Sequence, residues 1–232
     1  METRLYIALT SREMAGRKLI LDELAGLPLG IKVGLELFVS QGPALLEEIR
    51  KADFPLFLDL KFHDIPFTVE GAVRSACRFE PELLNVHASG GMEMMRAAAE
   101  AVEGDTRLLA VTVLTSLSGD DLHRAGFRGS PEELVTGMAM AAREAGIHGV
   151  VCSPLEASAV RDAAGPDFLI VTPGVRPAGA GMDDQKRTST PFEAVKAGAT
   201  SLVAGRPVTL AKDPRSAAES LLSEINLAFS ER

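Results

Sequence analysis

The segment from Asp59 to Thr68 places two carboxylates and one ammonium group within six residues, in the order Asp59, Lys61 and Asp64. The apolar run at 54–58 that precedes it is typical of a buried strand. Side chains alternate between the two faces of a strand, so Asp59 and Lys61 are predicted to point the same way, about 6.5 Å apart along the backbone. This arrangement favours an active site. The alternative is a solvated ion cluster at a sheet edge.

Polar residues follow other apolar runs of the chain in the same way. They include Lys32, Asn85 with His87, Thr115 with Ser116, and Gly205 with Arg206. In barrels of alternating strands and helices, catalytic groups come from the C-terminal ends of several strands. Convergence of this kind is harder to attribute to chance than a single ion pair. For His63 and His87 we expect structural hydrogen bonding rather than chemistry.

Short apolar runs alternate with segments of helical period along the whole chain. The strands are predicted at 5–9, 30–33, 56–60, 83–87, 108–112, 149–152, 168–171 and 201–204, and helices at 43–52, 68–79, 92–102, 131–145 and 156–163. This alternation is typical of a parallel sheet with helical crossovers, and the number of repeats suits a closed barrel. The predicted fold is an α/β (β/α)8 TIM barrel, one domain spanning residues 1–232.

Composition limits the class of protein. The 232 residues are 46% hydrophobic, enough for one large core, and a net charge of −8 argues against a nucleic-acid-binding surface. Two cysteines, Cys77 and Cys152, are too few for a disulfide framework. No apolar run is long enough to span a membrane, and the N-terminal segment lacks an export pattern. We therefore expect a cytoplasmic protein with a small-molecule substrate.

Two loops at the predicted strand ends suggest how a substrate is held. The Gly-rich segment 173–185 follows the seventh predicted strand and is expected to form a mobile active-site lid. Gly205-Arg206 follows the eighth strand, where barrels commonly hold phosphate. Glycine lets backbone N–H groups approach an anion, and the arginine fork matches phosphate geometry. A phosphorylated substrate is therefore expected, unless Arg206 is only a surface residue after a tight turn.

The ordered set of these motifs resembles the orotidine 5′-phosphate decarboxylase family over essentially the whole chain. The match rests on residues 32–34, 59–66, 85–91, 110–116, 149–153, 171–176, 184–185 and 205–209. The resemblance implies decarboxylation of orotidine 5′-phosphate to UMP, the last step of de novo UMP synthesis, without a cofactor and without a metal.

The resemblance also assigns catalytic roles. Lys32, Asp59, Lys61 and Asp64 match an alternating array of charges, of which Lys32 and Asp59 also contact the substrate. Lys61 is expected to stabilise a carbanion and then to donate a proton to it. The family's active unit is a homodimer, so Asp64 and Thr68 are expected to reach into the neighbouring subunit's site.

The remaining substrate contacts are likewise implied by the resemblance. Gln185, Gly205 and Arg206 match the residues that hold the 5′-phosphate. Arg176 matches a residue of the closing lid, and Thr115 matches a residue that contacts the pyrimidine. Neither a membrane nor a nucleic acid is an expected partner.

One position departs from the family pattern. After the first strand the family has Ala-Leu-Asp, whereas this chain has Ala8-Leu9-Thr10. In the family, the carboxylate of that aspartate binds the ribose and neighbours the lysine that matches Lys32. The affinity of this chain for ribose is therefore in question. Two alternatives stay open: a nucleotide-binding pseudoenzyme weakened at Thr10, and a magnesium-dependent sugar-phosphate aldolase or decarboxylase that shares Asp59, Lys61 and Asp64. Those metal-dependent relatives need a further carboxylate where this chain has Lys32.

Overall fold

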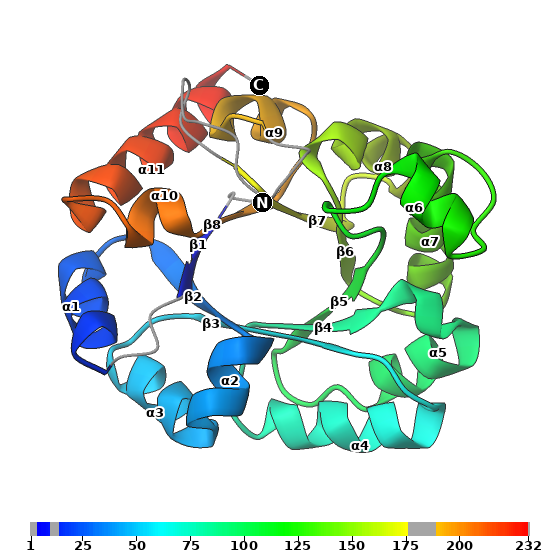
Figure 1. The fold of residues 1–232 in the computed structure, drawn as a ribbon, viewed down its shortest axis with the longest axis horizontal. Helices are drawn as coiled ribbons and strands as arrows, with labels where there is room; N and C mark the ends of the chain where they lie inside the picture. The colour runs from blue at the N-terminus through cyan, green and yellow to red at the C-terminus, as the bar shows by residue number, and fades with distance from the viewer. Residues whose placement is uncertain (1–3, 10–13, 176–188, 232) are drawn as a thin grey trace.

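A computed structural model describes residues 4–9, 14–175 and 189–231 of the chain. These residues form a closed barrel of parallel strands, in which each strand pairs with the next and β8 pairs with β1. Figure 1 shows the helices as an outer ring around the strands. The strands are β1 Arg4–Leu9, β2 Leu29–Gly34, β3 Leu56–Phe62, β4 Leu83–His87, β5 Arg107–Val111, β6 Gly149–Val151, β7 Leu169–Pro173 and β8 Ser201–Ala204.

Helical segments connect these strands. They are α1 Met14–Leu24, α2 Leu35–Gln41, α3 Pro43–Lys51, α4 Pro66–Cys77, α5 Met92–Glu100, α6 Gly119–Arg124, α7 Pro131–Glu144, α8 Ala157–Ala164, α9 Pro191–Lys196, α10 Arg206–Thr209 and α11 Pro214–Ser230, with short 3₁₀ turns η1 Ala88–Gly90 and η2 Pro154–Glu156. The predicted TIM barrel is confirmed, and each end of the predicted strands and helices lies within two residues of the observed one.

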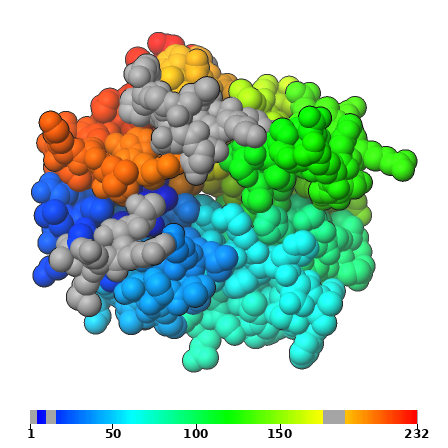
Figure 2. Space-filling model, viewed as in Figure 1, coloured from blue at the N-terminus to red at the C-terminus, as the bar shows by residue number. Residues whose placement is uncertain are grey.

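Two layers of apolar side chains account for the barrel. The inner layer consists of Tyr6, Phe57, Leu83, Leu109, Leu169, Val171 and Val203. Alternate strand residues, such as Ile7 and Ile170, belong to the larger core between strands and helices. Figure 2 shows that side chains fill the space that separates the ribbons in Figure 1. The barrel is therefore a packed core, and its functional surface lies at the strand ends.

One glycine in the barrel wall is required by this packing. The Tyr6 ring packs edge-on against Phe57, with ring centroids 5.7 Å apart. A Cβ atom at Gly30 would lie 2.6 Å from two carbons of the Tyr6 ring. Glycine at this position therefore makes room for the Tyr6 ring and its contact with Phe57.

Local sequence signals define several helix starts. Ser118, Ser130 and Thr190 each form a reciprocal capping box with an acidic residue three positions later. Proline occupies the first turn of α3, α4, α7, α9 and α11, where its missing N–H costs no hydrogen bond. Across the described part of the chain, no helix has the length and apolar character needed to cross a membrane.

Candidate active site

A cavity of about 290 Å³ opens at the C-terminal ends of the strands. Its polar lining comes from β2, β3 and the segments after β5 and β8, and its apolar lining includes residues of β1, β3, β5, β6, β7 and β8. The polar and charged lining residues include Lys32, Asp59, Lys61, Thr115, Gly205 and Arg206. Six residues that the sequence assigned to the site thus meet in one cavity, as convergence of the strand ends predicted.

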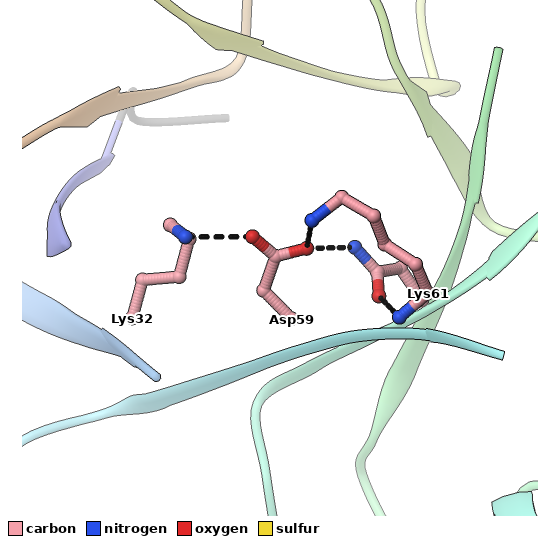
Figure 3. Close-up of polar contacts among 4 residues, drawn as sticks. Lys32, Asp59 and Lys61 are labelled. Carbon is pink, nitrogen blue, oxygen red and sulfur yellow. Dashed lines mark hydrogen bonds and ion pairs between the residues drawn. The ribbon is translucent and has the colours of Figure 1, made fainter. Parts of the chain in front are cut away.

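Asp59 is at the centre of the charged part of this cavity. Its Oδ2 atom accepts a hydrogen bond from Lys32 Nζ at 2.6 Å, and its Oδ1 atom accepts one from Lys61 Nζ at 2.5 Å. Figure 3 shows the two ammonium groups on different sides of the carboxylate. The predicted ion pair of Asp59 and Lys61 is therefore present, and Lys32 extends it to a chain of three charges.

Burial and charge act in opposite directions on Asp59. The residue is only 7% exposed, and burial by itself opposes ionisation. The charges and hydrogen bonds of Lys32 and Lys61 outweigh that effect and hold the pKa of Asp59 below its ordinary value. The carboxylate is therefore ionised at neutral pH, and it keeps both ammonium groups close to one another.

Lys61 does not continue a regular strand, which corrects the simple alternation expected from sequence. Its backbone has a φ of 53°, in the left-handed region that residues with a Cβ atom rarely adopt. The pairing of β3 with β4 also shifts register between Leu58 and Phe62. Strained backbone of this kind is frequent at functional sites. The Lys61 side chain nevertheless returns to Asp59, and 35% of it is exposed.

Asn85 is the residue of this network to which sequence reasoning gave no role. It is fully buried on β4, its Nδ2 atom donates to Asp59 Oδ1 at 2.7 Å, and its Oδ1 atom accepts from the Lys61 backbone N–H at 2.7 Å. The sequence did contain a signal for this role, since Asn85 interrupts the apolar run 83–86 and a buried amide needs hydrogen-bond partners.

Asp64 and Thr68 are placed differently from the other predicted site residues. Both side chains are exposed, and neither lines the cavity of their own chain. Asp64 Oδ1 accepts from the backbone N–H of Ile65 at the start of α4, at 2.7 Å. Ile65 and Phe67 beside them are 65% and 82% exposed.

A pair of histidines lies next to the charged network. The rings of His63 and His87 have centroids 5.5 Å apart. Burial, followed by the charges of His63 and Lys61, lowers the pKa of His87, and Asp59 opposes the shift. His87 is therefore neutral at pH 7, and it adds no positive charge beside Lys61.

Three further predicted positions, Thr10, Arg176 and Gln185, lie outside the described residues, as does most of the predicted lid. Within the described ranges, no three His, Cys, Asp or Glu side chains are grouped as metal ligands. Lys32 Nζ also donates a hydrogen bond to Asp59 Oδ2. The carboxylate that would be needed as a metal ligand therefore already binds an ammonium group.

Comparisons with known proteins agree with this geometry. Residues 3–221 match the family described as "Orotidine 5'-phosphate decarboxylase / HUMPS family". The chain is 54% identical over 200 residues to the orotidine 5′-phosphate decarboxylase of Trichlorobacter lovleyi, covering 84% of this chain and 83% of the relative. It is 45% identical over 233 residues to that of Moorella thermoacetica, covering 97% and 92%.

Solved structures give the same result. The crystal structure of orotidine 5′-phosphate decarboxylase from Lactobacillus acidophilus superimposes with a TM-score of 0.86 and 35% sequence identity, covering 97% of this chain and 100% of that chain. An uncharacterised conserved protein from Geobacillus kaustophilus superimposes with a TM-score of 0.83 and 36% identity, covering 96% and 100%.

Proposed function

Because this chain belongs to the orotidine 5′-phosphate decarboxylase / HUMPS family, we propose that it converts orotidine 5′-phosphate to UMP and CO2, the last step of de novo UMP synthesis. One observation carries the proposal: the Asp59 carboxylate lies between the ammonium groups of Lys32 and Lys61 inside the cavity. The reaction needs a fixed cation where negative charge develops, and this network supplies one.

The chemistry follows from the bond that breaks. Loss of CO2 leaves an electron pair on C6 of the pyrimidine, which has no neighbouring carbonyl or iminium group to accept it. An ammonium nitrogen at about 4 Å would stabilise that charge by roughly 4 kcal/mol at an effective dielectric constant of 20. Lys61 supplies this cation and then donates the proton that replaces CO2 on C6. Solvent returns a proton to Lys61.

The other two members of the chain of charges prepare Lys61 for this step. Asp59 accepts hydrogen bonds from both lysines, and so it fixes the direction of Lys61 Nζ. A carboxylate beside the substrate carboxylate also disfavours the bound substrate relative to a state that is losing CO2. Lys32 balances the charge of Asp59 when substrate is bound.

Binding energy comes from the parts of the substrate that do not react. Arg206 and the Gly205 backbone line the cavity on the β8 side and are proposed to hold the 5′-phosphate, with Gln185. Thr115, after β5, is proposed to contact the pyrimidine. Arg176 is proposed to contribute to closure over the phosphate, as in the family pattern.

We propose that the active unit is a homodimer in which Asp64 and Thr68 complete the partner's site. Their side chains do not line their own cavity, and exposed Ile65 and Phe67 offer apolar surface for a second copy.

A complementation experiment tests the shared site. The variants Lys61→Ala and Asp64→Asn should each be inactive alone. In a dissociated and reassociated mixture, half of the random dimers would contain one native site, giving about a quarter of the parent activity. No recovery would place Asp64 in its own site.

A direct assay tests the proposed activity. Loss of orotidine 5′-phosphate is followed by absorbance with purified protein, before and after dialysis against EDTA. We expect turnover that EDTA does not change, because Lys61 supplies the cation. Turnover that requires added Mg2+, or no turnover of orotidine 5′-phosphate, would contradict the proposal.

We further propose that the protein acts in the cytoplasm, since Cys77 and Cys152 are buried free thiols.

A further inference from the structure

The ladder between β3 and β4 is interrupted beside the charged network. The register shifts between Leu58 and Phe62, so that three residues of β3 face one residue of β4, Asn85. A bulge of this kind bends the strand and leaves backbone groups without ladder partners. The last of the three residues is Lys61, whose backbone is left-handed. Its N–H therefore needs a partner from outside the ladder.

Asn85 supplies that partner and also holds the carboxylate. Its Oδ1 atom accepts from the Lys61 N–H at 2.7 Å, and its Nδ2 atom donates to Asp59 Oδ1 at 2.7 Å. The same Asp59 oxygen contacts Lys61 Nζ at 2.5 Å. One fully buried amide thus ties the backbone of Lys61 to the carboxylate that aims its side chain.

Only one orientation of the amide satisfies both neighbours. If the amide were reversed, its NH2 would face the Lys61 N–H and its oxygen would face the Asp59 carboxylate, and both hydrogen bonds would be lost. A leucine would fill a buried strand position at a lower desolvation cost, as Leu83 and Leu109 do on the same barrel face. The amide is therefore explained by its two hydrogen bonds and not by packing.

We propose that Asn85 is a positioning residue for the reaction, and this rests on the proposed decarboxylase function. It holds Lys61 in the left-handed conformation and Asp59 in the orientation that directs Lys61 Nζ into the cavity. Asn85 itself does not line that cavity, so it acts through the two charged residues.

Two variants test the proposal. Asn85→Ala should lower kcat about 100-fold, since two buried hydrogen bonds are lost, and should change KM less than about threefold, since phosphate binding is untouched. Asn85→Asp keeps the shape. When protonated, the new carboxyl accepts from the Lys61 N–H and donates to Asp59. When ionised, it repels Asp59.

The kcat of Asn85→Asp relative to the parent should therefore fall as pH rises. The charged or titratable groups around this position are Asp59 and Lys61 on β3, Lys32 beyond them on β2, and His87 on its own strand. On β5 its partner is the apolar Leu109. Burial and the neighbouring Asp59 carboxylate raise the pKa of a carboxyl placed here.

Thr106→Val is the matched control. Thr106 is also buried and donates to the Pro81 carbonyl at 2.8 Å, at the opposite end of β5 from the cavity. This variant should lower the melting temperature and leave kcat unchanged. The positioning role would be overturned if the Asn85 variants changed kcat no more than Thr106→Val does. It would also be overturned if the ratio of the kcat of Asn85→Asp to that of the parent were the same at every pH.

Crystal structures of the parent and of Asn85→Asp at high pH give a readout that does not depend on activity. The parent should keep the left-handed Lys61 and the contact of Nζ with Asp59, and the variant should lose one or both. An unchanged Lys61 in the variant would contradict the proposal. A parent that does not turn over orotidine 5′-phosphate would instead contradict the proposed function, and the structural comparison would still decide the role of Asn85.

Discussion

Replacing Lys61 by alanine removes the proposed cation and proton donor in one step, while the rest of the network keeps its partners. Asp59 retains the hydrogen bond from Lys32 at 2.6 Å and the one from Asn85 at 2.7 Å, so the buried carboxylate is not left unpaired. The Lys61 side chain is 35% exposed at the cavity, and its loss empties little of the core. We therefore expect Lys61→Ala to fold and to bind UMP.

The catalytic loss has two parts. The electrostatic part is roughly 4 kcal/mol, or about 10³-fold, for an ammonium at about 4 Å from C6. General acid catalysis contributes about 10²- to 10⁴-fold. The product predicts a loss of kcat of about 10⁵-fold or more, with both parts realised in the transition state.

The assay compares absorbance loss of orotidine 5′-phosphate for the parent, Lys61→Ala and a surface control. Lys51→Ala is suitable because Lys51 is exposed at the end of α3 and does not line the cavity. The control should match the parent, and calorimetry should detect UMP binding by all three. Turnover by Lys61→Ala within tenfold of the parent would refute the role of Lys61.

Three further predictions concern phosphate, ribose and pH. Arg206→Ala should weaken UMP binding much more than uridine binding in calorimetry, because the proposed contact of Arg206 is with the phosphate; equal losses would place Arg206 elsewhere. Thr10→Asp should raise kcat/KM about 10- to 100-fold by restoring a charged acceptor for ribose. A kcat/KM equal to or below that of the parent would mean that the site is adapted to threonine. Because the folded-state pKa of Asp59 lies below its ordinary 3.8, ionised Asp59 contributes stability above pH 3.8 that is lost as pH falls through the lowered pKa. The unfolding free energy of the parent should therefore exceed that of Asp59→Asn at pH 7, and the difference should shrink at acid pH in denaturant titrations; a difference independent of pH would contradict the shift.

The strands were predictable because each is an apolar run whose two faces are both buried. β4 at Leu83–His87 and β8 at Ser201–Ala204 occur as predicted, and predicted helices such as α3 and α7 follow ordinary apolar periodicity and begin with proline. Short elements such as α10 were not predicted, since four residues carry too little periodicity.

The site was predictable in its members and less so in its geometry. Asp59, Lys61 and Lys32 meet because parallel strands bring their C-terminal ends together, which the pattern alone implies. The left-handed backbone of Lys61 was not predictable, because its N–H donates to Asn85 Oδ1 on the neighbouring strand, 24 residues away. Strand alternation predicts a regular β3, and tertiary contact overrides it.

The fate of the C6 proton tests the central claim most directly. Metal-free protein is incubated with orotidine 5′-phosphate in D2O, and the product is examined by NMR and mass spectrometry together with the CO2 released. Protonation by the exchangeable ammonium of Lys61 predicts one CO2 for each UMP and one deuterium at C6 of UMP, and Lys61→Ala should form neither product at a comparable rate. Unchanged orotidine 5′-phosphate, UMP without deuterium at C6, or a reaction that begins only after Mg2+ is added would contradict the account.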